Sequence, residues 1–155
     1  MTKTEFINLK ICKNYDELNY LLSIWRFKEK KIVLSYGNFD LLHFGNIDYL
    51  ANSADFGDIL IVGVQNNPKH ETIQDAGKRA FNVAALNSVA CVVFFDEDPY
   101  ELLKIVEPDT LSYKDKQQLN SSIIEYVERS GINVQKIDNI PGFSSFEVLE
   151  KIKTI

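Results

Sequence analysis

The sequence predicts one α/β domain built on a doubly wound parallel sheet of five strands. Apolar, β-branched or aromatic runs of strand length occur five times, and a helix-like segment follows each of them. Strands covered by helices on both faces have this continuous apolar character, and strand–helix alternation predicts right-handed crossovers in a parallel sheet. The five runs are KIVLSY (31–36), DILIVGV (58–64), ACVVFF (90–95), DTLSY (109–113) and NVQKI (133–137).

The helix-like segments that follow these runs lie near residues 43–55, 75–88, 99–106, 117–130 and 144–153. A further segment, NYDELNYLLSIWRFKEK (14–30), precedes the first run and has the spacing of an amphipathic helix. Asn14 is its expected N-cap, because an asparagine side chain can accept a hydrogen bond from the first turn. We therefore expect a single domain, residues 1–155, in which an N-terminal helical extension (1–30) leads into the α/β core (31–155).

Length and composition indicate an ordinary globular protein. The 155 residues can enclose a full hydrophobic core, and 45% of them are hydrophobic and 25% charged. No apolar run approaches the roughly 20 residues that cross a bilayer, and the N-terminus has no signal-peptide core, so we expect a cytoplasmic protein without a membrane partner. The net charge of −5 argues against a general nucleic-acid surface, and any anionic ligand would need a local basic cluster.

The two cysteines, Cys12 and Cys91, lie far apart in the sequence. They belong to no C-x-x-C or metal-type spacing, so the spacing implies neither a disulfide nor a zinc site. Cys91, within CVVFF, fits a buried thiol. We assign no protein ligands for a metal.

Ligands of open parallel sheets bind outside the carboxyl ends of the strands, where loops lead into helices. This rule directs attention to three loops, at residues 36–46, 65–79 and 110–117. The turn into the last helix, 139–147, is a fourth candidate. We expect these segments to surround the functional site.

The first of these loops, within SYGNFDLLHFGN (35–46), has the residues of an anion site. Gly37 permits a sharp turn and the close approach of a ligand, and Asp40 can cap a helix that begins near Leu41. His43 and Asn46 would then share one helix face, about 5–6 Å apart at Cβ, with Gly45 leaving room between them. A helix N-terminus offers free N–H groups and the positive end of the helix dipole to an anion.

Residues Gly37-Asn38-Phe39-Asp40-Leu41-Leu42-His43-Phe44-Gly45-Asn46 resemble the G-x-F-D-x-x-H-x-G-H motif of the HxGH nucleotidyltransferase superfamily, the cytidylyltransferase-like proteins with a Rossmann-like fold. The resemblance continues through Gly57-Asp58, Arg79 and Glu107-Pro108-Asp109. The segment before the first strand makes heptose-phosphate adenylyltransferases the most similar members, with glycerol-3-phosphate cytidylyltransferases next.

The resemblance implies a reaction and its participants. An oxygen of a small sugar phosphate or polyol phosphate attacks the α-phosphorus of CTP or ATP, and pyrophosphate leaves, usually with Mg²⁺. No covalent enzyme intermediate is expected, so catalysis rests on positioning and charge stabilisation. Family members often form dimers, so a homodimer is a possible assembly.

The resemblance also suggests roles for individual residues. His43 would stabilise the transition state at the α-phosphate, assisted by Asn46 and Arg79. Lys69 and His70 would contact the acceptor. The nucleotide would lie against Tyr36, Gly37, Asn38, Phe39, Asp40, Gly45, Lys114, Asp115, Ser144 and Ser145.

Each of these assignments has a purely structural alternative. His43 could bond to the local backbone at a helix start, and Arg79 could form a surface ion pair. Lys69, His70 and Lys114 could be solvated loop residues. Ser144 and Glu147, the ends of SSFE, have the spacing of a capping box.

The sequence departs from the family pattern in three places. Asn46 stands where the motif has its second histidine, and an amide can donate a hydrogen bond but cannot become cationic. In FSSFE, Phe146 replaces a threonine and Glu147 occupies the usual position of a lysine or arginine. The loop after the second core strand is shortened, and Asp115 is the possible remnant of a glycine–aspartate element. Two hypotheses therefore remain: an active nucleotidyltransferase, or a catalytically degenerate homologue that binds nucleotide or phosphosugar as a regulatory or structural subunit.

Overall fold

Six parallel strands form one sheet in the order β1-β4-β3-β2-β5-β6. The computed structural model describes all residues from 1 to 155. The α/β fold class and the five predicted core strands are confirmed, but the predicted number of strands was one too few. The strands are β1 (Ile11–Cys12), β2 (Ile32–Gly37), β3 (Ile59–Gln65), β4 (Cys91–Phe95), β5 (Thr110–Tyr113) and β6 (Asn133–Lys136).

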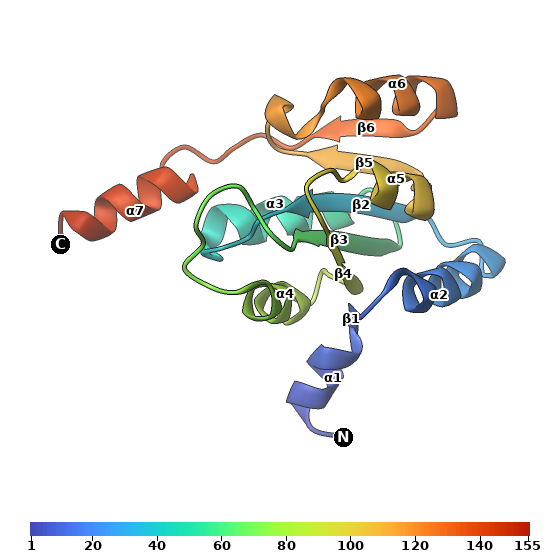
Figure 1. Cartoon of the computed structure of the whole chain (residues 1–155), viewed down its shortest axis with the longest axis horizontal. Coiled ribbons are helices and arrows are strands. Elements are labelled where there is room, and N and C mark those ends of the chain that lie inside the picture. Colours follow the sequence, from blue (N-terminus) through green and yellow to red (C-terminus); the bar gives the residue numbers. More distant parts are fainter.

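Helices cover both faces of this sheet (Figure 1). Helices α2, α5 and α6 pack on one face, and α1, α3 and α4 pack on the other. Helix α7 lies beyond one end of the sheet and has no buried residue. The helices are α1 (Lys3–Leu9), α2 (Tyr15–Phe27), α3 (Phe44–Ala54), α4 (Ala76–Ala84), α5 (Tyr100–Val106), α6 (Ser121–Ser130) and α7 (Ser145–Lys153), with a short 3₁₀ helix η1 (Lys116–Gln118) before α6.

The missing strand lies in the N-terminal extension, which was predicted to be purely helical. β1 contains only two residues, paired with β4 through Ile11 opposite Val92 and Cys12 opposite Val93. A strand this short has no periodicity that a sequence pattern could show. The predicted helix behind it is confirmed: the Asn14 side chain accepts a hydrogen bond from the N–H of Glu17 at the start of α2.

Helix α2 anchors the extension to the sheet through two leucines. Leu18 and Leu22 are fully buried in the core on its face of the sheet. Burying a leucine side chain contributes about 1.5–3 kcal/mol, so these two residues contribute strongly to holding the helix on the sheet. Tyr20 and Phe27, on the same helix, remain exposed.

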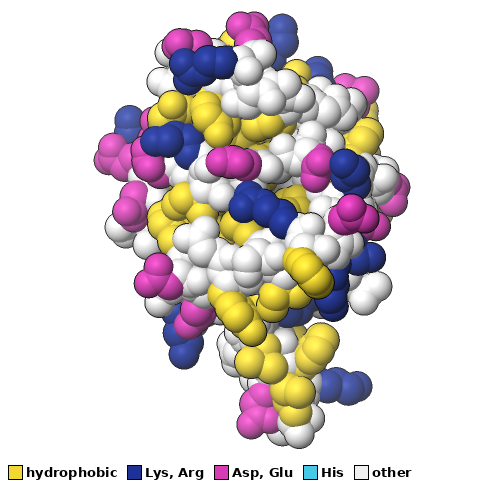
Figure 2. All heavy atoms as spheres, turned by 90° about the vertical axis from the view of Figure 1, so that its right-hand side faces the viewer, with side chains coloured by type: hydrophobic (Ala, Val, Ile, Leu, Met, Phe, Trp, Pro, Cys, Tyr) yellow, Lys and Arg dark blue, Asp and Glu magenta, His cyan; other side chains and the backbone are white.

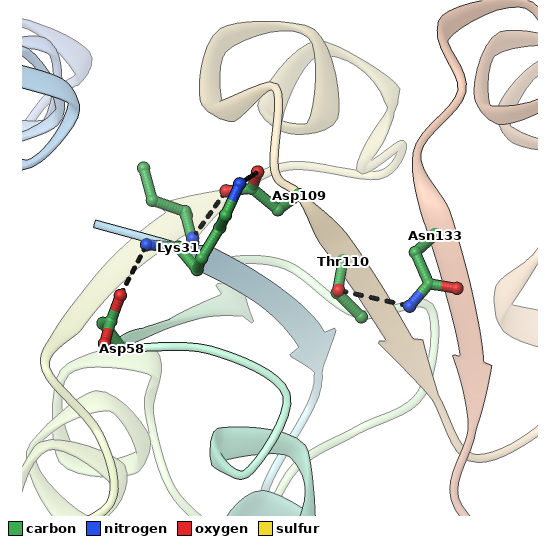
Figure 3. Close-up of polar contacts among 6 residues, drawn as sticks. Lys31, Asp58, Asp109, Thr110 and Asn133 are labelled. Carbon is green, nitrogen blue, oxygen red and sulfur yellow. Dashed lines mark hydrogen bonds and ion pairs between the residues drawn. The ribbon is translucent and has the colours of Figure 1, made fainter. Parts of the chain in front are cut away.

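Two aspartates fix the amino ends of the central strands (Figure 3). The Asp58 carboxylate accepts a hydrogen bond from the N–H of Lys31 at 2.8 Å, before β2 begins. Asp109 accepts one from the N–H of Ile32 at 2.8 Å, and the Lys31 ammonium lies 3.2 Å from its other oxygen. Asp58 and Asp109 belong to the segments that resemble the family. They stabilise the end of the sheet that lies opposite the predicted ligand loops.

Apolar side chains gather on the narrow projection formed by α1 (Figure 2). Met1, Phe6 and Leu9 are exposed there. None of the helices combines the length and the hydropathy that crossing a bilayer would require. The possible homodimer stays a prediction.

Candidate functional site

A cavity of about 500 Å³ opens at the carboxyl ends of β2 and β5. All four loop regions that the sequence singled out contribute to its wall. The first loop follows β2, the second follows β3, the third follows β5, and the fourth leads into α7. Its lining consists of Tyr36, Gly37, Asn38, Phe39, Asp40, Asn46, Tyr49, His70, Glu71, Thr72, Lys114, Asp115, Gln118, Asn139, Ser144 and Ser145.

Most residues assigned to the nucleotide from the resemblance line this cavity. Four assigned residues do not: His43 stands beside it, and Gly45, Lys69 and Arg79 have other surroundings. Lys69 is exposed in the loop between β3 and α4, whereas its neighbour His70 reaches the cavity wall.

His43 is the N-cap residue of α3, and its ring approaches the cavity through Ser145. Its Nε2 lies 3.4 Å from the Ser145 Oγ, whereas Nδ1 is buried without a hydrogen-bond partner. Burial lowers the pKa of His43, and the nearby charge of Lys114 lowers it further. The imidazole is therefore neutral at pH 7 and ready to gain charge when an anion arrives.

The N-terminus of α3 has no side-chain cap. The sequence predicted that Asp40 would cap this helix and that the helix would begin near Leu41, and both predictions were wrong. The helix begins at Phe44, so its first N–H groups and the positive end of its dipole remain available near His43.

Asp40 instead joins the two loops that form one side of the cavity. Its carboxylate accepts hydrogen bonds from the N–H groups of Ile73 and Gln74, both at 2.9 Å. The Gln74 side-chain amide donates back to the Asp40 carbonyl at 2.6 Å. Because its carboxylate is engaged in this way, Asp40 shapes the cavity wall while adding less repulsion toward an anionic ligand.

Lys114 is the only lysine or arginine that lines the cavity. It takes part in none of the ion pairs of the structure, and its ammonium lies 6.0 Å from the centre of the Tyr49 ring. Burial lowers the pKa of Lys114, and the charge of Asp48 opposes that shift. A desolvated cation without a partner, next to His43, is the basic group that an acidic protein needs in order to bind an anion.

Asn46 lines the cavity, but one of its side-chain N–H groups is engaged in a local hydrogen bond. Its Nδ2 donates a hydrogen bond to the Leu41 carbonyl at 3.0 Å. An asparagine amide has a second N–H and an acceptor oxygen, so Asn46 can still contact a ligand. The charge that a second histidine would supply is missing at this position.

Arg79 is buried, with a relative exposure of 1%, and is not the surface ion pair that was considered as an alternative. Its Nε donates to the Gln74 carbonyl at 3.0 Å, Nη1 to the Asn38 carbonyl at 2.7 Å and Nη2 to the Asn66 carbonyl at 3.3 Å. The guanidinium thus connects the loop after β2 with both ends of the loop after β3. Arg79 therefore holds the two loops in position without lining the cavity itself.

Gly45 has no room to offer a ligand. A Cβ atom at this position would lie 2.5 Å from the carbonyl oxygen of Phe143 and 2.9 Å from its Cβ. The Phe143 ring also packs edge-on against Phe44, with ring centres 5.3 Å apart. The glycine therefore allows the segment before α7 to approach the start of α3, which brings Ser144 and Ser145 to the cavity.

The capping box at the start of α7 is confirmed. The Ser144 Oγ accepts from the N–H of Glu147 at 3.1 Å, and the Glu147 carboxylate accepts from the N–H of Ser144 at 3.0 Å. This hydrogen bond occupies the carboxylate that stands where the family has a basic residue. Phe146 is 72% exposed and contributes nothing to the cavity wall.

Gln118, which was not among the predicted site residues, organises the loop after β5 through its side chain. Its Oε1 accepts from the N–H groups of Lys114 and Asp115 at 2.8 and 2.9 Å, and its Nε2 donates to the Tyr36 carbonyl at 2.7 Å. The Tyr36 hydroxyl donates in turn to the Gln118 carbonyl. These contacts set the position of Lys114. The spacing of Asp115 and Gln118 is that of a capping box, which could have indicated the local contact, whereas the contacts with Tyr36 are long-range.

Four further cavity residues were missed as well: Tyr49, Glu71, Thr72 and Asn139. Tyr49 is buried on α3, and its hydroxyl donates to the Ser112 carbonyl at 3.0 Å. The other three are loop residues whose types carry no motif of their own. Two strained or unsatisfied groups also lie here: Phe39 has a φ of +52°, and the Asn38 Oδ1 is buried without a partner.

Comparison with known proteins identifies the family of the chain. The model of the family described as "Cytidylyltransferase-like" matches residues 34–151. "Bifunctional protein HldE" of Campylobacter jejuni strain RM1221 is 38% identical over 156 residues, which cover 93% of this chain and 32% of that protein. The protein with the same description from a Nitratiruptor species is 33% identical and covers 92% and 32%. The chain thus spans about a third of the length of these relatives.

Two solved structures share the fold. A lipopolysaccharide core biosynthesis protein from Thermoplasma volcanium has a TM-score of 0.60 and 25% identity, with 72% of this chain and 97% of that chain covered. A pantoate-β-alanine ligase from Francisella tularensis has a TM-score of 0.58 and 17% identity, with 94% and 78% covered. The second similarity concerns the fold alone.

Proposed function

The chain belongs to the cytidylyltransferase-like family of nucleotidyltransferases, and from this premise we propose that it transfers a nucleotidyl group from ATP or CTP to a small sugar phosphate or polyol phosphate, releasing pyrophosphate. One observation carries the proposal. The uncapped start of α3, the imidazole of His43 and the ammonium of Lys114, which forms no ion pair, lie at or beside one cavity, so a helix dipole, a hydrogen-bond donor that can gain charge and a cation serve a single space.

These groups suit transfer without a protein nucleophile. The acceptor oxygen attacks the α-phosphorus directly, and charge accumulates on the phosphate oxygens as pyrophosphate departs. His43 would donate from Nε2 to one of these oxygens, and Lys114 would offset the charge of the phosphate chain. Donors held in place before the reaction begins stabilise such a transition state effectively.

Mg²⁺ would bind chiefly through the nucleotide. No three histidine, cysteine, aspartate or glutamate side chains cluster in a way that could hold an ion, and Asp40 is already engaged with two backbone N–H groups. Because Mg²⁺ commonly keeps several waters and binds through substrate phosphates, it would enter with the triphosphate and reduce the repulsion among its oxygens.

Two similarities favour ATP and a sugar-phosphate acceptor. The segment before β2 resembles heptose-phosphate adenylyltransferases, and the solved relative from Thermoplasma volcanium is described as a lipopolysaccharide core biosynthesis protein. His70, an exposed residue that lines the cavity, would contact an acceptor phosphate. Lys69 is exposed and does not line the cavity.

The contacts at α7 favour an active enzyme over a degenerate binding subunit. The Glu147 carboxylate is held by the N–H of Ser144, so it does not extend toward a phosphate. The family motif has basic residues at positions 46 and 147, and Lys114 supplies a positive charge in the cavity in their place. The loss of charge from the family motif is therefore partly offset within the same cavity.

Pyrophosphate release tests the proposed function. The purified chain should release pyrophosphate only when ATP or CTP is combined with a phosphorylated acceptor, across a panel of sugar 1-phosphates and glycerol 3-phosphate. Lys69→Ala, which alters an exposed residue outside the cavity, should match the wild type. Nucleotide-dependent thermal stabilisation without any pyrophosphate would contradict the proposal and support a binding subunit.

We predict that nucleotide affinity depends on pH through His43. The pKa of the free imidazole is lowered by burial and by Lys114, and a bound polyphosphate would raise it, so binding takes up a proton. The affinity should therefore rise as the pH falls through the pKa of the complex and level off below the pKa of the free protein, by up to about tenfold per pH unit.

Calorimetric titration of wild type and His43→Gln between about pH 6 and 8 measures this dependence. The nucleotide phosphates titrate in both proteins, so the difference between the two profiles isolates the imidazole. Parallel profiles would show that His43 does not gain a proton when the nucleotide binds.

A further inference from the structure

The two cysteines meet across the first two strands of the sheet order. Cys12 ends β1 opposite Val93, and Cys91 lies two residues before Val93 on β4. Side chains two residues apart on a strand share a face, so both thiols point into the core that α2 covers. Their sulfur atoms are 3.3 Å apart, and both residues are buried. Spacing along the chain did not indicate this contact.

We propose that Cys12 and Cys91 are a redox pair that peroxide converts to an intramolecular disulfide, which fastens the N-terminal segment to the sheet. The sulfurs need to approach by little more than 1 Å to reach the length of a disulfide bond, about 2.05 Å. β1 contains two residues and lies at the edge of the sheet, so it can adjust to this change more easily than an internal strand.

The reaction balances with hydrogen peroxide as the oxidant. The Cys12 thiolate attacks one peroxide oxygen, and the O–O bond breaks to give a sulfenic acid and hydroxide, which is protonated to water. The Cys91 sulfur then attacks the Cys12 sulfur, the S–O bond breaks, and the proton of Cys91 leaves with the departing hydroxide as a second water. Two thiols have been oxidised by two electrons in total, and one peroxide has been reduced to two waters.

The surroundings of the pair assign the first step to Cys12. Cys12 lines two surface hollows, of about 250 and 450 Å³, whereas Cys91 lines neither. The hydrogen bond from Cys91 lowers the pKa of Cys12, and the same contact together with burial raises the pKa of Cys91. Because the thiolate is the reactive form, Cys12 reacts first, and Cys91 is already in contact to intercept the sulfenic acid.

The disulfide would add a covalent connection where the sheet has few contacts. β1 pairs only with β4, and α1 and β1 together form the segment that precedes α2. A bond between residues 12 and 91 closes a long loop and restricts the unfolded chain. Neither cysteine lines the cavity beside His43, so this inference stands apart from the proposed function.

Mass spectrometry after peroxide treatment tests the pair. The treated, full-length wild type should lose the mass of two hydrogen atoms, remain a monomer on non-reducing gels and show no alkylatable thiol after denaturation. Proteolysis should yield one cross-linked pair of peptides containing Cys12 and Cys91. The thermal midpoint should rise by about 5–10 °C and return on reduction.

Single variants separate this pair from general oxidation. In Cys91→Ala, Cys12 should accumulate sulfenic or sulfinic acid, and in Cys12→Ala, Cys91 should remain reduced. Two wild-type thiols still alkylatable after peroxide, a disulfide-linked dimer, or separate oxygen adducts on each cysteine would each overturn the proposal. The peptide map of the wild type decides the matter even if a variant folds poorly.

Discussion

Replacing His43 by alanine should lower kcat/KM for nucleotidyl transfer by about 10²–10³-fold, because one donor to the charge that develops at the α-phosphate is lost. His43 is half-buried and forms no side-chain cap on α3, so the substitution removes little that holds the fold together. The loss should appear mainly in kcat, since the interaction strengthens in the transition state.

Steady-state pyrophosphate release, with circular dichroism to monitor folding, measures this effect. His70→Ala is the matched control: it alters the other histidine, an exposed residue that lines the same cavity, and should raise the KM of the acceptor rather than lower kcat. A folded His43→Ala protein with wild-type kcat/KM would remove His43 from the chemistry.

The second large effect concerns Arg79. Arg79→Met should lower the free energy of unfolding by about 3–5 kcal/mol, because it leaves three backbone carbonyls without the donors that now satisfy them and each such loss costs about 1–3 kcal/mol. The carbonyls belong to Asn38, Asn66 and Gln74, so the loops after β2 and β3 should also separate. Both kcat and KM for the nucleotide should worsen, as expected for a site that has lost its shape.

Urea denaturation together with kinetics tests this prediction. Lys78→Met is the control, because Lys78 precedes Arg79 on α4 and its side chain is exposed and paired only with Asp75. A direct phosphate contact predicts a different outcome for Arg79→Met: wild-type stability with weaker triphosphate binding. That result would return Arg79 to the ligand site.

The sequence was informative where structure depends on nearby residues. Continuous apolar runs predicted β2 to β6. The residue types at the helix starts predicted the caps at Asn14 and Ser144, whose hydrogen bonds span only three residues. The HxGH-like segment also placed the cavity correctly, because the carboxyl ends of neighbouring parallel strands meet at one edge of the sheet.

Long-range hydrogen bonds account for the predictions that were wrong. Asp40 was assigned to the nearest helix start, but its carboxylate binds N–H groups 33 and 34 residues away, and α3 then begins later than expected. The space beside Gly45 is filled by Phe143, which comes from a segment almost one hundred residues further along the chain. Such contacts exist only after the sheet has assembled.

The charge of the cavity also depends on long-range contacts that the sequence does not reveal. Local comparison with the motif counts Asn46 and Glu147 as losses, whereas the folded chain turns Glu147 onto a backbone N–H and directs Lys114 toward the space beside His43. Gln118 makes the second change possible by holding the loop that carries Lys114. A substitution within a motif can therefore be judged only together with what its neighbours in space supply.

The proposed function requires that this acidic protein concentrates positive potential at one point, next to His43, to receive a triphosphate. A crystal structure with a non-hydrolysable analogue of whichever triphosphate gives the larger thermal shift would examine it directly. Phosphate oxygens should lie within hydrogen-bond distance of the His43 Nε2 and the Lys114 Nζ. Phosphates bound instead in the hollow between Asn66 and Arg79, or a bound nucleotide whose phosphates avoid His43, would contradict it.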